Sequence, residues 1–292
     1  MKILLTGSSG FIGSRIKKAF QEHGDEVFSV TRGESAKGDV QSDVSDPRIV
    51  EKVSFPIDLI IHAAAYTDTR PSAANNYEQF FATNCLGTLN MLKVAQRRGA
   101  DLIYISTCDV YGKPKSLPIN ETHPPNPITV YAATKSAAEQ LCHGMSQANN
   151  FRLRIARPFN TYGPNSPKYR VISSIITQLV SSDSVTINNI QSKRDFVFVD
   201  DVASAIVKLS EFQGDDVIVN IGTGITHSIA EVFEVAKRVT GKDTATLHAQ
   251  EESSGPIPVL QADITRIKKL GWRPKFDLER GLLETAREMR LN

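Results

Sequence analysis

The first thirteen residues constrain the fold more than any other stretch of this chain. Residues 3–5 are an apolar run that predicts a short buried strand, and Gly7, Gly10 and Gly13 follow at the spacing G-x-x-G-x-x-G. A helical segment begins directly after the third glycine. Such glycines let the backbone turn tightly and approach a pyrophosphate, whose charge is stabilised by N–H groups at the helix start. The stretch predicts a dinucleotide-binding strand, turn and helix; a glycine-rich turn without a ligand is the alternative.

Alternating strand and helix patterns favour an α/β fold with a doubly wound, parallel, Rossmann-type sheet. Residues 195–201 are expected to return to this sheet, with Asp200 and Asp201 capping the helix that follows. Further strands are expected at 26–30, 57–61, 100–105, 151–156, 185–187 and 217–221. Helices are expected at 77–98, 131–148, 171–180, 202–211, 228–239, 264–270 and 278–289.

The turn-rich stretch after Pro158 indicates a change of character, and it predicts a smaller C-terminal lobe interleaved with the sheet. We expect a dinucleotide-binding domain over residues 1–159 and about 195–222. A substrate-binding lobe is expected over about 160–194 and 223–292.

Charge and cysteine content argue against several classes of protein. Lys and Arg total 34 against 32 Asp and Glu, which argues against a general nucleic-acid or membrane-surface role. No stretch approaches the roughly 20 apolar residues of a membrane span, and a chain that starts in a strand shows no signal peptide. The three cysteines are scattered and no His-x-x-x-His occurs, so we expect no metal site and a cytoplasmic protein.

Two further stretches carry residues suited to proton transfer. Tyr131 and Lys135 are four residues apart and share one helix face. A cation one turn away stabilises tyrosinate and lowers the tyrosine pKa, although an ordinary surface pair is the alternative. Ser106 and Thr107 follow a buried strand, where ligands bind in open α/β sheets; the alternative is a turn whose hydroxyls satisfy the backbone.

In this order, the motifs resemble the extended short-chain dehydrogenase/reductase family, in particular its nucleotide-sugar epimerase/dehydratase group. The resemblance covers essentially the whole chain. The motifs that carry it are the glycine loop, residues 62–65 (HAAA), 84–88 (NCLGT), 106–112 (STCDVYG), Tyr131 with Lys135, 157–164 (RPFNTYGP), 194–196 (RDF), 220–224 (NIGTG) and 270–274 (LGWRP).

The resemblance implies a catalytic set of Thr107, Tyr131 and Lys135. Tyr131 would move a proton to or from a sugar hydroxyl, usually at C4, while Lys135 would bind the nicotinamide ribose and Thr107 would orient the sugar oxygen. Asn160 and Arg194 would contact the diphosphate of a nucleotide sugar; a surface salt bridge is the alternative for Arg194.

The resemblance also implies a set of residues that contact the dinucleotide. Asp43 and Val44 would contact adenine, and the alanines of the HAAA motif would line the pyrophosphate and ribose. The full set is Gly7, Gly10, Phe11, Ile12, Gly13, Thr31, Arg32, Asp43, Val44, Ala63, Ala64, Ala65, Asn84, Tyr131, Lys135, Pro158 and Phe159.

Two departures from the family pattern bear on the cofactor and the reaction. NAD-specific members usually place an Asp at the end of the second strand, where this chain has Thr31 and then Arg32. Arg32 can pair with a 2′-phosphate, which favours NADP over NAD, unless Arg32 only stacks on adenine or faces solvent. Cys108 and Asp109 replace the Asp and Glu of the 4,6-dehydratases, which argues against a typical member of that class.

Two enzyme activities remain, a nucleotide-sugar 4-epimerase and an NADPH-dependent 4-keto-6-deoxy nucleotide-sugar reductase. Thr31, Arg32 and residues 255–263 favour the reductase, and residues 251–254 (EESS) lack the phosphate-binding Arg often found there in epimerases. A non-catalytic dinucleotide sensor is disfavoured because Tyr131 and Lys135 are both present. The resemblance further implies a homodimer formed by helices 77–98 and 131–148, and it leaves the base and the sugar open.

Overall fold

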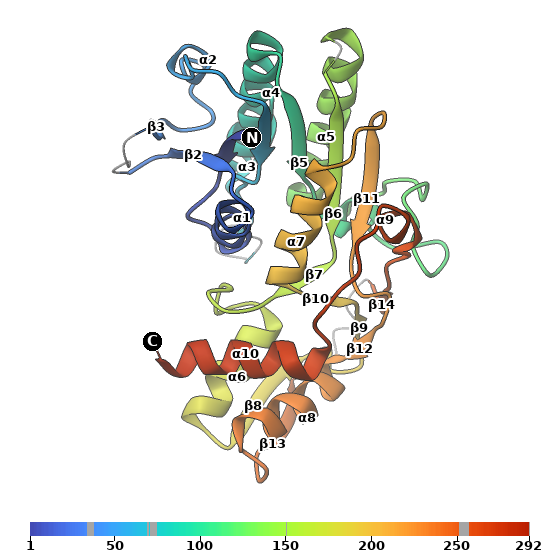
Figure 1. Cartoon of the computed structure of the whole chain (residues 1–292). Coiled ribbons are helices and arrows are strands. Elements are labelled where there is room, and N and C mark those ends of the chain that lie inside the picture. Colours follow the sequence, from blue (N-terminus) through green and yellow to red (C-terminus); the bar gives the residue numbers. More distant parts are fainter. Residues whose placement is uncertain (34–37, 69, 71–74, 150, 251–256, 292) are drawn as a thin grey trace. The chain divides into compact units, whose positions relative to one another are not determined.

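The computed structural model describes residues 1–33, 38–68, 70, 75–149, 151–250 and 257–291. Its contacts divide the chain into two compact units, which we call unit 1 and unit 2. Unit 1 comprises Met1–Gly112, Pro124–Arg157 and Ile206–Val219. Unit 2 comprises Lys113–His123, Pro158–Ala205 and Asn220–Asn292, so the two units alternate along the sequence (Figure 1).

A seven-stranded sheet forms the centre of the dinucleotide-binding fold that the sequence predicts. Its strand order is β11-β6-β5-β4-β1-β2-β3, and the strand pairs from β3 to β6 are parallel. This confirms the expected parallel Rossmann-type α/β sheet. The strands are β1 (Lys2–Thr6), β2 (Glu26–Thr31), β3 (Val40–Gln41), β4 (Leu59–His62), β5 (Asp101–Ile105), β6 (Leu153–Pro158) and β11 (Val217–Ile221).

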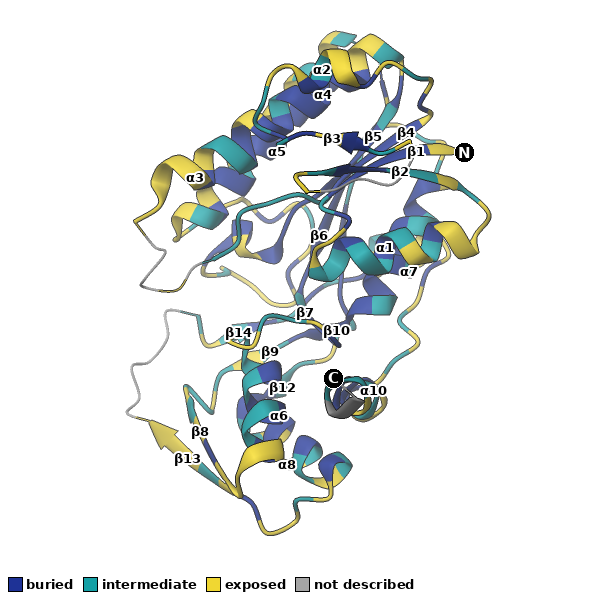
Figure 2. Cartoon of the chain, turned by 90° about the vertical axis from the view of Figure 1, so that its left-hand side faces the viewer, coloured by how far each residue is buried: buried dark blue, intermediate teal, exposed yellow. Residues whose placement is uncertain are grey.

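Helices cover both faces of this sheet, so its central strands are buried along most of their length and mainly apolar. In β4 every residue is buried, and β1 is buried except for Lys2. One face is covered by α2 (Ile49–Lys52), α4 (Gly87–Arg98) and α5 (Val130–Asn149), and the opposite face by α1 (Phe11–Glu22) (Figure 2). Leu4, Ile60, Leu102, Met91 and Ala138 belong to the core between the sheet and α4 and α5.

The expected helix 77–98 contains an irregular turn that the sequence does not predict. It consists of α3 (Tyr77–Phe81), a π-helical turn η1 (Ala82–Leu86) and α4. Such π turns often occur at functional sites. Here the turn contains the buried Asn84, whose side chain makes the contacts described below.

Unit 2 contains smaller sheets, and here two expectations are wrong. Residues 195–201 do not return to the main sheet, because β10 (Phe196–Phe198) pairs with β7 (Asn160–Tyr162) in a separate two-stranded sheet. Asp200 and Asp201 do not cap a helix, because α7 (Val199–Ser210) begins before them. Asp201 instead accepts hydrogen bonds from the N–H groups of Lys275 and Phe276.

The other strands of unit 2 contain only two to five residues, and apart from β8 they have no counterpart in the sequence prediction. They are β8 (Ser184–Asn188) with β13 (Thr246–Gln250), and β9 (Lys193–Arg194) with β12 (His227–Ser228) and β14 (Val259–Leu260). The helices are α6 (Val171–Ser181), α8 (Ile229–Thr240), α9 (Thr265–Lys269) and α10 (Leu278–Leu291). Across the described residues of the chain, none of the helices is both long and apolar enough to cross a membrane.

Candidate active site

The glycine loop has the close contacts that its spacing predicts. Gly7 has a φ of +71°, which L side chains rarely adopt, and a Cβ there would lie 2.7 Å from the backbone nitrogen of Ala64. A Cβ on Gly13 would lie 2.0 Å from the Gly7 oxygen, so only glycine lets α1 pack this closely on the turn. Among the described residues, no side chain caps the N-terminus of α1, which begins with Phe11, Ile12 and Gly13. Its first N–H groups and helix dipole therefore suit an anionic ligand.

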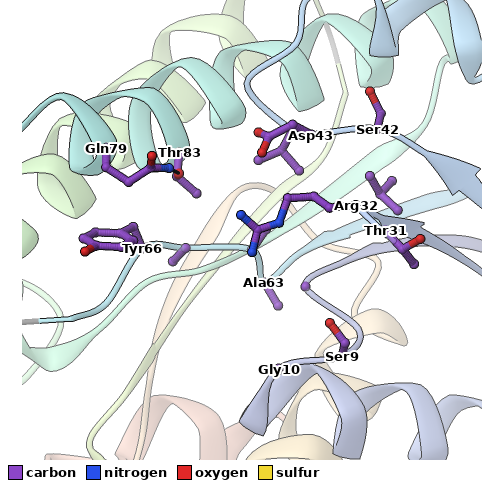
Figure 3. Close-up of a pocket in the computed structure, with 15 residues that line it drawn as sticks. Ser9, Gly10, Thr31, Arg32, Ser42, Asp43, Ala63, Tyr66, Gln79 and Thr83 are labelled. Carbon is purple, nitrogen blue, oxygen red and sulfur yellow. Dashed lines mark hydrogen bonds between the residues drawn. The ribbon is translucent and has the colours of Figure 1, made fainter. Parts of the chain in front are cut away.

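A pocket of about 240 Å³ opens beside this loop, at the carboxyl ends of β1, β2 and β4 (Figure 3). Most of the residues expected to bind a dinucleotide meet here, although they come from four separate stretches of the sequence. The expected residues that line it are Gly7, Gly10, Thr31, Arg32, Asp43, Val44, Ala63, Ala64 and Ala65.

Arg32 and Asp43 mark the end of the pocket that is next to β2. The exposed Arg32 side chain extends across the pocket toward Ala63 and Tyr66 (Figure 3). One carboxylate oxygen of Asp43, Oδ1, accepts hydrogen bonds from the N–H and hydroxyl of Ser45, both at 2.8 Å. Thr31 donates its hydroxyl hydrogen to the Gly33 carbonyl at 3.2 Å. The pocket therefore combines a cation that directly follows β2 with a carboxylate held by its own turn.

A series of buried hydrogen bonds supports the side of the pocket lined by Ala63, Ala64 and Ala65, which we call the alanine wall. Thr88 donates to the carbonyl of Asn84 at 2.6 Å, so its hydroxyl oxygen is left to accept from His62 Nε2 at 3.1 Å. His62 Nδ1 then accepts from Thr6 Oγ1 at 2.6 Å, and Thr6 Oγ1 accepts from the Ala64 N–H at 3.1 Å. Burial, with a smaller contribution from the charge of Lys135, lowers the pKa of His62 to about 3. These hydrogen bonds assign a neutral imidazole to His62, with its proton on Nε2.

Thr107 lies directly after β5, as expected for a residue at the carboxyl end of a strand. It is the N-cap of a short 3₁₀ turn, η2 (Cys108–Tyr111), and its Oγ1 accepts from the Asp109 N–H at 3.2 Å. The turn ends at Gly112, which has a φ of +58° and where a Cβ would lie 1.8 Å from the Asn126 oxygen. The hydroxyl expected to orient a sugar oxygen is thus fixed in a tightly constrained segment.

Tyr131 and Lys135 lie in the first turns of α5. The hydroxyl of Thr129 accepts from the Ala132 N–H at 3.1 Å and caps this helix. Lys135 is 1% exposed; its Nζ donates to the Ile105 carbonyl at 2.7 Å and lies 4.1 Å from the centroid of the Tyr104 ring. Burial lowers the pKa of Lys135 to about 7 against the opposing effects of Cys142, Glu139 and Cys85.

Asn84 connects the pocket to this helix. Its Oδ1 accepts from the Tyr66 N–H at 2.8 Å, and its Nδ2 donates to the Tyr66 carbonyl at 3.1 Å and to Thr134 Oγ1 at 3.0 Å. Tyr66 lines the pocket, and Thr134 is the neighbour of Lys135 in α5. The side chain is 1% exposed, so these contacts define its position in the interior of unit 1.

The remaining expected residues belong to unit 2. Pro158 ends β6, and the N–H of Phe159 donates to the Ile221 carbonyl at 2.8 Å. The amide oxygen of Asn160 is buried without a hydrogen-bond partner among the described residues. The guanidinium of Arg194 donates to the carbonyls of Lys193, Ile257 and Pro258 at 2.9–3.3 Å.

Six pocket residues were not predicted from the sequence: Ser9, Val30, Ser42, Tyr66, Gln79 and Thr83. Gln79 and Thr83 are joined by a 2.8 Å hydrogen bond across one helical turn. The position of Tyr66 directly after the HAAA motif is a signal that points to it. Residues 251–256, which entered the comparison of epimerase with reductase, lie outside the described residues.

Comparison with known proteins agrees with this geometry. A family model described as "NAD dependent epimerase/dehydratase family" matches residues 3–222. UDP-glucuronic acid decarboxylase 6 of Arabidopsis thaliana is 32% identical over 319 residues, covering 100% of this chain and 89% of that protein.

Solved structures resemble the whole chain as well. The UDP-glucose 4-epimerase of Thermotoga maritima, solved with UDP-glucose, is 28% identical with a TM-score of 0.91 and covers 100% of this chain and 99% of its own. RMD from Pseudomonas aeruginosa, complexed with NADPH, is 26% identical with a TM-score of 0.87. It covers 99% of this chain and 99% of its own. The chain therefore belongs to the NAD dependent epimerase/dehydratase family, an extended short-chain dehydrogenase/reductase group.

Proposed function

We propose that this protein is a nucleotide-sugar 4-epimerase that uses a nicotinamide dinucleotide and acts on a UDP-sugar. The observation that carries the proposal is the contact made by Asn84. Its one side chain joins Tyr66, on the wall of the dinucleotide pocket, to Thr134, in the helical turn that holds Lys135. A redox cofactor in the pocket and a proton-transfer pair on α5 would then belong to one rigid frame.

The pocket residues fit a dinucleotide. The uncapped start of α1 and the crowded turn at Gly7 and Gly13 suit a pyrophosphate, while Asp43 suits the amino group of adenine. When bound, the dinucleotide supplies reversible two-electron redox chemistry at the sugar carbon.

The proposed proton transfer uses three residues of unit 1. Tyr131 takes the proton of the sugar 4-hydroxyl as C4 is oxidised, and returns a proton once the sugar presents its other face. A protonated Lys135 favours the tyrosinate form. Because burial lowers the pKa of Lys135 to about 7, ligand binding and pH both influence that protonation. Thr107 donates a hydrogen bond to the sugar oxygen and orients it.

Asn160 and Arg194 of unit 2 are proposed to contact the nucleotide diphosphate. A buried amide oxygen without a donor is a group that a ligand can satisfy, and this supports a role for Asn160. The UDP-sugars named for the relatives suggest UDP as the nucleotide. We also propose NADP over NAD, because Arg32 lines the pocket where a carboxylate would hold the ribose of NAD.

Arg32 also supports the second candidate, an NADPH-dependent ketoreductase, since a reductase must exchange its cofactor at every turnover. The dinucleotide retained by purified protein separates the two. Tightly held NAD or NADP together with interconversion of UDP-glucose and UDP-galactose supports the epimerase. An empty site, NADPH-dependent reduction of a 4-keto-6-deoxy nucleotide sugar and no interconversion would replace it with the reductase. UDP-glucuronate belongs in the same assay, because a decarboxylase releases CO₂ from it.

Tyr131→Phe tests whether the protein is an enzyme at all. The variant removes one hydroxyl and is expected to lower kcat by about 10²- to 10⁴-fold while the dinucleotide still binds. A matched control is Tyr169→Phe, a 40% exposed tyrosine of unit 2. Unchanged turnover in Tyr131→Phe would contradict the proposed chemistry.

We further propose a cytoplasmic homodimer. Phe81, Leu86 and Leu141 are large apolar side chains that are 55%, 40% and 37% exposed on α3, η1 and α5, elements that pack against one another. Such exposed apolar groups on adjoining helices are typical of a protein interface. Sedimentation of Leu141→Arg is expected to show a monomer where the parent sediments as a dimer; a monomeric parent protein would exclude the dimer.

A further inference from the structure

Glu139 and Arg157 form a buried ion pair inside unit 1. The guanidinium Nη2 lies 2.5 Å from Glu139 Oε2, and Nε lies 2.9 Å from Oε1. The two residues are 1% and 3% exposed. Although burial lowers the pKa of Arg157, its hydrogen bond to Glu139 and the charge of that carboxylate raise it above its usual value. Two N–H groups of the guanidinium thus meet the two carboxylate oxygens, so the ion pair is bidentate.

This pair holds both ends of residues 106–111, which we call the Thr107 segment. Ser106, just before Thr107, donates its hydroxyl hydrogen to Glu139 Oε1 at 2.5 Å. Tyr111, the last residue of η2, accepts at its phenol oxygen from Arg157 Nη1 at 2.9 Å, and its ring centroid lies 4.8 Å from the guanidinium carbon. Ser106 and Tyr111 are themselves 5% and 0% exposed.

Glu139 also places the Thr107 segment in the same frame as the proton-transfer pair. It lies four residues after Lys135 on α5, so it occupies the same side of that helix. Lys135 holds the end of β5 through the Ile105 carbonyl, and Glu139 holds the next residue through its hydroxyl. One helix thus carries Tyr131 and Lys135 and fixes, by two side chains, the strand end from which Thr107 projects.

Stability alone gives no reason for a charged pair at this position. A buried ion pair is often no more stabilising than well-packed apolar side chains, because both charges lose their hydration. Such a pair does impose direction: the carboxylate accepts and the planar guanidinium donates at fixed angles. Direction is what a hydroxyl that orients a substrate requires, because a displacement of about 1 Å is enough to cost roughly 10²-fold in rate.

We propose that Glu139 and Arg157 are positioning residues that set the Thr107 hydroxyl relative to Tyr131 and Lys135 by holding Ser106 and Tyr111. The proposal rests on the proposed function for the role of Thr107, whereas the restraint on the segment does not. The experiment therefore has one part that measures the restraint and one that measures its effect on catalysis.

The variant for both parts is Ser106→Ala/Tyr111→Phe. It removes two hydroxyls, and with them the hydrogen bond at each end, while leaving the ion pair and the contact of the guanidinium with the ring at position 111 in place. Removing Glu139 or Arg157 singly would instead leave a buried charge unpaired. Ser146→Ala is the matched control: Ser146 is a 2% exposed serine on the same helix whose hydroxyl donates to the Asp216 carboxylate at 2.7 Å.

Amide hydrogen exchange of residues 106–112 measures the restraint. The reporters are the N–H groups of Asp109 and Gly112, which donate within the segment to Thr107 Oγ1 and to the Asp109 carbonyl. The proposal expects exchange about tenfold faster in the double variant, as for the loss of one net hydrogen bond, and unchanged exchange in Ser146→Ala. Unchanged exchange in the double variant overturns the proposal, whatever reaction the protein catalyses.

Turnover of UDP-glucose measures the effect on catalysis. We expect the double variant to lower kcat by about 10- to 100-fold with little change in KM. The same two substitutions made in Thr107→Val are expected to lower kcat less than about twofold further, because the hydroxyl through which they act is already absent. An equal loss in both backgrounds overturns the proposal. If the wild-type protein epimerises neither UDP-glucose nor another UDP-sugar, the proposed function fails and the exchange measurement alone decides the positioning role.

Discussion

The two units use buried charge in different ways. In unit 1 the main sheet is a ladder of mostly parallel strands, and the buried carboxylate of Glu139 is paired with another side chain, the guanidinium of Arg157. In unit 2 the strands are short, and buried carboxylates take over part of the backbone pairing. Asp195 is 0% exposed and accepts from the N–H groups of Thr223, Gly224 and Ala262. Asp201 does the same for Lys275 and Phe276.

The two kinds of buried charge therefore have different structural roles. The pair of Glu139 and Arg157 orients side chains near the site, whereas Asp195 and Asp201 hold the backbone of unit 2 in place. A side-chain pair can be removed as a unit, whereas a carboxylate whose partners are backbone groups has no replaceable partner. Burial raises the pKa of Asp195 even though four hydrogen bonds oppose the rise. The structural contribution of Asp195 is therefore to provide acceptor oxygens for these donors.

The largest effect on stability is expected in unit 2. Asp195→Ala leaves three backbone N–H groups and the Thr223 hydroxyl without their acceptor, and we expect it to lower the free energy of unfolding by about 5 kcal/mol. Asp195→Asn keeps the shape and one acceptor, so it should cost less. Urea unfolding followed by circular dichroism measures both. Equal and small losses would remove the distinction between the units.

Removal of the ion pair in unit 1 is expected to follow a different pattern. Glu139→Leu alone should cost about 3–5 kcal/mol, because it leaves a buried guanidinium unpaired, while Glu139→Leu/Arg157→Met should recover most of that loss. The same urea titration is the measurement. A double variant as unstable as the single one would show that this pair, like Asp195, has no apolar substitute.

Lys135 predicts how stability depends on pH. Its folded pKa of about 7 lies below its usual value of 10.5, so the unfolded chain binds more protons between these two values. The stability of wild type relative to Lys135→Met should therefore rise from pH 7 toward pH 10, by about 1 kcal/mol per pH unit, and level off below pH 7. Unfolding titrations of both proteins at pH 6, 7, 8 and 9 check the slope. A flat difference would mean that Lys135 keeps an ordinary pKa.

Arg32 is expected to affect stability least. It is exposed, so Arg32→Gln should change the free energy of unfolding by less than about 0.5 kcal/mol. If it pairs with a 2′-phosphate, NADPH binding should weaken about tenfold or more while NADH binding changes little. Calorimetric titration with both coenzymes measures this ratio, and Arg97→Gln, an exposed arginine at the end of α4, is the control. Equal weakening for both coenzymes would assign Arg32 to adenine stacking.

The same contrast explains what the sequence predicts. Buried parallel strands such as β4 and β5 contain continuous apolar runs, and the glycine loop has a spacing typical of a dinucleotide-binding turn, so the sheet and most of the pocket are predictable. The two-residue strands β9 and β14 have no period to detect. The path of the chain at the start of α7 depends on Asp201, whose hydrogen-bond partners lie more than seventy residues later in the sequence.

Two parts of the site were beyond local patterns for the same reason. The π turn around Asn84 forms where that side chain reaches Tyr66 and Thr134, contacts of 18 and 50 residues in sequence separation. Gln79 and Thr83 belong to no motif and become pocket residues only because α3 and η1 pass beside the alanine wall. Long-range contacts of this kind are visible only once the chain has folded.

The hydrogen-bond chain through His62 has a practical consequence for kinetics. With a pKa of about 3, this imidazole keeps one protonation state throughout the range in which Lys135 gains and loses its proton. The charge of His62, next to the proposed dinucleotide pocket, therefore does not change near neutral pH. A break in the pH–rate profile around pH 7 would consequently report the titration of Lys135 and Tyr131. His62, the histidine that is hydrogen-bonded to β1 through Thr6, would not contribute to it.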